Sequence, residues 1–140
     1  MKWTTWQGVG VDRMAYAWVI RKFIDEAAVF EFIPEGSTST GQAEVFDIPG
    51  VRLSHHQGHS SVHTIMLEYG LTSPELTRIA QMVDEADLVQ EFNLEPAAIG
   101  LDLICRGIRR TSQNDALALE RGALVFEALY AELLDEGKNL

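Results

Sequence analysis

Apolar residues recur at helical spacing over most of the chain. Met14, Ala15, Trp18 and Val19 share one face of an almost wholly apolar segment, so residues 11–24 are predicted to form a largely buried helix. Similar stripes, with capping residues, proline in the first turn or a terminal glycine, predict four more helices. These cover residues 61–69, residues 74 to about 91, residues 95–109, and a last helix that Asn114 or Asp115 caps.

Short β-branched and aromatic runs lie between the first two predicted helices. Residues 29–33, 45–46 and 51–53 are strand candidates, and residues 47–50 form a Pro-Gly turn between the last two. The fold class predicted for residues 1–140 is therefore a single α+β domain. It is predominantly helical, with about five helices and a small sheet of short strands in the N-terminal third.

The composition limits the classes of partner. A net charge of −10 and a pI near 4.7 exclude general affinity for nucleic acid or an anionic membrane. The single cysteine, Cys105, excludes an internal disulfide and suits a reducing compartment. The N-terminus has no apolar core of signal-peptide length, and no segment reaches the roughly 18 apolar residues that cross a bilayer. We expect a cytoplasmic protein, and the apolar helices make a homodimer plausible.

All four histidines, at positions 55, 56, 59 and 63, lie within nine residues of the chain. If a helix begins near Ser60 or Ser61, His59 and His63 lie on one face and can bind one metal ion. The glutamate that zinc proteases carry between two such histidines is absent, because position 60 is serine. His55, at the end of the preceding strand, could approach the same point. The alternative is a solvated, histidine-rich loop.

The predicted helix that begins at Pro74 offers carboxylates. Helical spacing places Asp87 inside its apolar stripe, Asp84 at the edge and Glu85 on the opposite, wet face. An inward carboxylate is costly unless it is paired or bound to a cation. Imidazole and carboxylate ligands without thiolate favour zinc, manganese or iron. Alternatively, Asp87 caps a neighbouring helix or pairs with Arg13 or Arg21.

The segment VDRMAYAWVIRKFID at residues 11–25 resembles a signature of the chromate-resistance protein family, D-R-x-A-x-x-W-L-I-R-x-F-I-D. The resemblance continues through residues 46–51, Ser54-His55 and residues 86–88, so it spans nearly the whole chain. In that family the domain forms the C-terminus of ChrB-type proteins and also occurs as a stand-alone chain. The resemblance implies the fold and a connection with metals or oxyanions, but no defined reaction.

This chain departs from the family pattern at three positions. The family often carries cysteine and glutamate where Ser60 and His63 stand here, and histidine in place of Asp84. Two of these exchanges replace one type of metal ligand by another. A retained site with altered ligands would look like this, and the exchanges weaken any transfer of metal identity.

The leading hypothesis is a metal-binding domain whose site activates water or holds an oxyanion. The expected ligands of a zinc, manganese or iron ion are His55, His63 and Asp87, completed by Asp84 or His59. Arg13 and Arg21 would balance charge or contact an oxyanion, and Asp12 would support them. Two alternatives stay open: a non-catalytic sensory or interaction module that responds to a metal or anion, and a redox protein of the superoxide-dismutase type.

Overall fold

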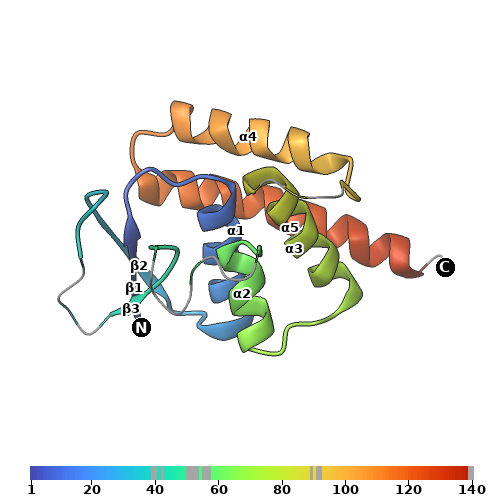
Figure 1. Ribbon diagram of the computed structural model, residues 1–140, viewed down its shortest axis with the longest axis horizontal. Helices are drawn as coiled ribbons and strands as arrows, with labels where there is room; N and C mark the ends of the chain where they lie inside the picture. The colour runs from blue at the N-terminus through green and yellow to red at the C-terminus, as the bar shows by residue number, and fades with distance from the viewer. Residues whose placement is uncertain are drawn as a thin grey trace.

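The N-terminal strand is the centre of a small parallel sheet. The computed structural model describes residues 1–38, 41, 43–49, 54, 58–88, 90 and 93–138 (Figure 1). In it β1 (Lys2–Trp6) pairs with β2 (Val29–Ile33) on one side and with β3 (Glu44–Val45) on the other. The register places Lys2 opposite Val29, and Trp3 opposite Phe30 and Glu44. All three strands therefore run in the same direction at one end of the molecule.

The strand predictions were confirmed in part. The strand at residues 29–33 is present with the expected bounds, and the candidate at residues 45–46 forms β3, which begins and ends one residue earlier. The candidate at residues 51–53 lies outside the described residues. The pattern gave no indication of β1. Its threonines Thr4 and Thr5 point to opposite faces of the sheet and are both buried, so both faces are covered there and the strand shows no alternation of polar and apolar residues.

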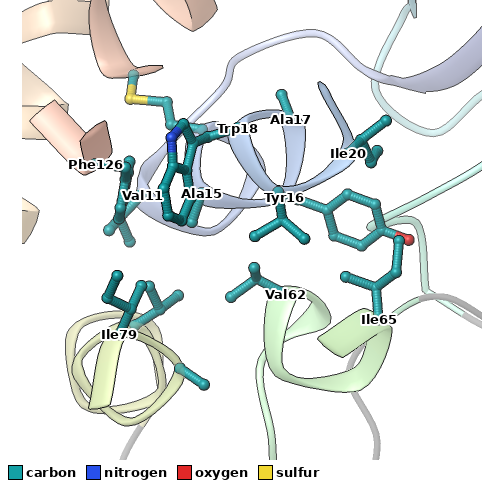
Figure 2. Packing of buried hydrophobic residues seen from close by; sticks show 14 of the residues in the cluster. Val11, Ala15, Tyr16, Ala17, Trp18, Ile20, Val62, Ile65, Ile79 and Phe126 are labelled. Atoms are coloured by element: carbon teal, nitrogen blue, oxygen red, sulfur yellow. The ribbon is translucent and has the colours of Figure 1, made fainter. Parts of the chain in front are cut away.

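Helix α1 (Val11–Val19) is the centre of the hydrophobic core. It continues directly into a π-helical turn, η1 (Ile20–Ile24), where the amide of Asp25 donates to the carbonyl of Ile20. The predicted helix at residues 11–24 is thus confirmed, with a wider last turn. Side chains from three other helices pack against α1. Figure 2 shows Val62, Ile65, Ile79 and Phe126 among them.

Four more helices surround α1: α2 (Ser61–Glu68), α3 (Pro74–Asp87), α4 (Ala97–Thr111) and α5 (Asp115–Lys138). Their starts agree with the predicted caps. The Ser73 hydroxyl accepts from the amide of Leu76, and the Asn114 side chain accepts from the amide of Leu117. Helix α3 ends at Asp87, about four residues earlier than expected. No helix of the described residues is long and apolar enough to cross a membrane.

Candidate metal centre

Three side chains that could bind a metal ion meet where α2 begins beside α3. The Nδ1 atom of His63 lies 2.6 Å from Oδ2 of Asp84, and Nδ1 of His59 lies 3.2 Å from the same oxygen. The two imidazole rings are 3.9 Å apart between centroids. One potential ligand atom from each residue lies within 4.8 Å of the others. The structure thus brings His59 and His63 together, with Asp84 as their carboxylate partner.

Ser60 connects the start of α2 to Asp84 through its backbone amide and its hydroxyl. It is the N-cap of α2, and its hydroxyl accepts from the amide of His63. The same hydroxyl donates to Oδ1 of Asp84 at 2.6 Å, and the Ser60 amide donates to that oxygen at 2.8 Å. A histidine just before the cap and another in the first helical turn are thereby brought to one side. Asp84 uses one carboxylate oxygen to hold Ser60 and the other to meet both imidazoles.

Asp84 is ionised despite its burial. Its side chain is only 1% exposed. Desolvation alone would raise the pKa of Asp84, but hydrogen bonds from His63 and from the hydroxyl and amide of Ser60 outweigh it, so the pKa lies below the ordinary aspartate value. A buried carboxylate that keeps its charge provides an anionic oxygen directly against two imidazoles, which suits a cation or a positively charged imidazole.

The family-like segment at the start of α1 anchors the same helix. The two carboxylate oxygens of Asp12, which is 3% exposed, accept from the amides of Ser61 and Val62, each at 2.8 Å. The Ser61 hydroxyl donates to Asp47, whose carboxylate also pairs with Nε of Arg13 at 3.0 Å. Asp12 and Arg13 both belong to the first turn of α1, so these contacts join the first turn of α2 to α1. Both thus act on the cluster through the backbone that carries it.

The placement predicted for the two aspartates of α3 was wrong. Asp84 is buried, whereas Asp87 is exposed. The four apolar residues predicted for the stripe, Leu76, Ile79, Ala80 and Val83, are all buried. The start of α2 covers the helix at Asp84, but Asp87 is the last residue of α3 and lines a cavity described below. Asp87 does not belong to the three-residue group, and His55 lies outside the described residues.

A cavity of about 490 Å³ is lined in part by this anchoring network. Asp12, Arg13, Asp47, Asp87 and Arg109 are among the residues that line it, together with Trp6, Gly8, Gly10, Glu35, Pro49 and Ser54. None of the three clustered residues does. The cavity therefore adjoins Asp12 and Asp47, which hold the first turn of α2, and the imidazoles do not line it.

Arg21 is placed away from both the cluster and this cavity. Its guanidinium donates to the carbonyl of Ala28 and lies 4.6 Å from the ring centroid of Phe30. It lines a separate cavity of about 180 Å³ beside α5. Arg13 does face the larger cavity, but its guanidinium is held by Asp47 and by carbonyls of residues 7 and 8. Neither arginine is a contact of Asp84.

The roles of two residues differ from those that the sequence suggested. Ser60 was expected near the start of a helix, and its position three residues before His63 was the signal of an N-cap, but its bond to Asp84 was not foreseen. Asp12 was expected to support Arg13 and Arg21, whereas its carboxylate holds the start of α2. The contact of Asp12 with α2 had no such signal, because 49 and 50 residues separate the partners.

Nearly the whole chain matches a known protein family. The family described as "ChrB, C-terminal domain" matches residues 3–133, so the chain belongs to this family. It is 31% identical, over 139 residues, to Protein ChrB of Cupriavidus metallidurans. The match covers 99% of this chain and 42% of that relative, so the chain spans about two fifths of its length. No solved structure matches the chain. The resemblance stated from the sequence is thereby confirmed.

Proposed function

We propose that this chain is a metal-binding domain of the chromate-resistance type, and that His59, His63 and Asp84 hold a divalent cation. The observation that carries the proposal is the buried carboxylate of Asp84, which faces two imidazole nitrogens with one oxygen. A carboxylate in this position needs positive charge beside it, and a cation between the three groups supplies it. The competing explanation is that a protonated imidazole, and not a metal ion, supplies the positive charge beside Asp84.

The donor set fits zinc, manganese or iron. Two imidazoles and one carboxylate are ligands that these ions accept, and three protein ligands leave a further position for a small molecule. When bound, such an ion would lower the pKa of a coordinated water or attract an oxyanion. His59 is the more accessible of the two histidines, with 40% of its side chain exposed against 16% for His63. A ligand from solvent would approach from the side of His59.

Ser60 and Asp12 would act as positioning residues for this function. Ser60 holds the carboxylate that both histidines face, and Asp12 holds the helical turn that carries His63. The predicted ligand roles of His55 and Asp87, and the oxyanion roles of Arg13 and Arg21, remain proposals. A cytoplasmic location also remains a proposal, which the single buried thiol supports.

Metal titration of the purified, tag-free chain tests the proposal. We expect stoichiometric binding of zinc, manganese or iron by calorimetry and elemental analysis, and at least a tenfold weaker affinity for Asp84→Asn and His63→Ala. Asp87→Asn is the matched control, because it removes a carboxylate from the same helix outside the cluster. We expect its affinity to equal that of the wild type.

The outcomes separate the alternatives. Zinc as the preferred metal supports water activation or an oxyanion site, whereas stoichiometric iron or manganese supports the redox alternative. If no metal binds after supplementation, or if Asp84→Asn binds as tightly as wild type, the proposed centre is wrong. A loss that appears in Asp87→Asn instead would move the ligand role to the cavity side of α3.

A further inference from the structure

The outer surface of α4 carries three large apolar side chains that no other part of the described chain covers. Ile99 is 76% exposed, Leu103 65% and Ile104 54%, while the inward residues Ala98, Leu101 and Cys105 are buried. The helix lies at the surface of the bundle in Figure 1. Helix α4 is therefore hydrophobic on two sides, which is typical of a helix with one partner inside the chain and another outside it.

Two glycines inside α4 have no packing role against the described residues of the same copy. A side chain at Gly100 or Gly107 would meet nothing within 4 Å, and neither glycine has a positive φ. A glycine inside a helix costs about 1 kcal/mol relative to alanine. Both glycines lie seven residues apart, on the flank next to Leu103. Their common use would be the close approach of another backbone or side chain.

The charge of α4 is opposite in sign to that of the whole chain. The helix carries three arginines, Arg106, Arg109 and Arg110, against one acidic residue, Asp102. The chain as a whole has a net charge of −10, and α5 carries six acidic residues against two basic ones. A second copy of the chain is therefore repelled by most of the surface and least by α4.

We propose that two copies of this chain associate through α4, with the two helices antiparallel about a two-fold axis at Leu103. In this alignment Leu103 packs against its own copy, and Ile99 of each helix lies opposite Gly107 of the other, where the missing side chain makes room. The three arginines lie beside residues 96–100 of the other helix, which carry no charge. A parallel pairing would instead place arginines against arginines.

The expected association is weak. A helix of 15 residues is about 22 Å long at 1.5 Å per residue. One pair of such helices covers less than the roughly 800 Å² per partner of a standard interface. The dimer should therefore depend on concentration.

Sedimentation velocity over a wide range of concentration tests the pairing. We expect the wild-type weight-average sedimentation coefficient to rise with concentration and Leu103→Glu to stay monomeric, with an unchanged circular dichroism spectrum. Leu67→Glu is the control, because Leu67 is 55% exposed on α2 and lies outside the pairing. A wild type that stays monomeric throughout, or a Leu103→Glu variant that dimerises equally, refutes the proposal.

Cysteine cross-linking tests the direction of the helices, since Cys105 is buried. The double variant Ile99→Cys/Gly107→Cys should form a covalent dimer on oxidation, and Ile99→Cys alone should not. A covalent dimer of the single variant would show a parallel pairing and overturn the antiparallel alignment.

Discussion

Replacing Asp12 by asparagine tests how the first turn of α2 is held. In the wild type each carboxylate oxygen of this buried side chain accepts from one backbone amide, that of Ser61 or Val62, at 2.8 Å. Asparagine keeps one acceptor oxygen and turns an NH₂ group towards the other amide. One charge-assisted hydrogen bond is lost and one buried amide is left without an acceptor.

The magnitude follows from these two losses. A hydrogen bond to a charged group contributes about 1.5–3 kcal/mol, and an unsatisfied buried donor costs about 1–3 kcal/mol. We therefore expect Asp12→Asn to lower the free energy of unfolding by about 3–5 kcal/mol, a large part of the roughly 5–15 kcal/mol of a typical domain. The metal affinity of the folded fraction should also fall, because His63 follows in the same helical turn.

Urea unfolding followed by tryptophan fluorescence measures this change, with Asp102→Asn as the control. Asp102→Asn is the same type of substitution, made at an exposed i,i+4 pair with Arg106. Loss of such a pair should lower the free energy of unfolding by less than about 0.5 kcal/mol. If Asp12→Asn and Asp102→Asn unfold with free energies within about 0.5 kcal/mol of each other, the carboxylate does not hold α2 as described.

Three further outcomes are expected. Burial raises the pKa of Cys105 to about 12, so its thiol should not react with an aromatic disulfide at pH 8 until denaturant unfolds the chain; rapid reaction in the native state would contradict its burial. A Cβ at Gly122 would lie 2.8 Å from two side-chain atoms of Met14, so Gly122→Leu should lower the free energy of unfolding by about 1–3 kcal/mol in a thermal melt. A hydrogen bond from Lys22 lowers the pKa of Glu127, so the carboxylate stabilises the fold above the ordinary glutamate pKa, and this contribution disappears as the pH falls through the lowered value. At pH 7 the free energy of unfolding of Glu127→Gln should therefore be lower than that of the wild type by less than about 1 kcal/mol, because the pair is half exposed. Near pH 3 the two proteins should have the same free energy of unfolding.

The helices could be predicted because their signals are local. The stripe of α3, the serine that caps it and the proline that follows are all within a few turns of one another, and the structure confirms each. Strand β1 could not be predicted, because its residues form a strand only when β2 and β3 flank them. A parallel strand depends on partners that are tens of residues away, which no local pattern reveals.

The candidate site divides in the same way. That imidazoles gather near residue 60, and that two of them share the start of a helix, follows from residue spacing alone. Which aspartate of α3 joins them does not, because both Asp84 and Asp87 continue the same stripe. The choice depends on where α2 begins and where α3 ends in space.

The amino-acid order by itself determined the helical elements, the acidic character and the kind of metal ligands this protein can offer, because each depends on the residue types and on short-range spacing. The tertiary structure alone decided that Asp84 is buried against His59 and His63, that Asp12 holds α2, and that Ile99, Leu103 and Ile104 of α4 are exposed. These are long-range outcomes: burial is set by which element covers a side chain, and a helix cannot specify its neighbours through its own periodicity.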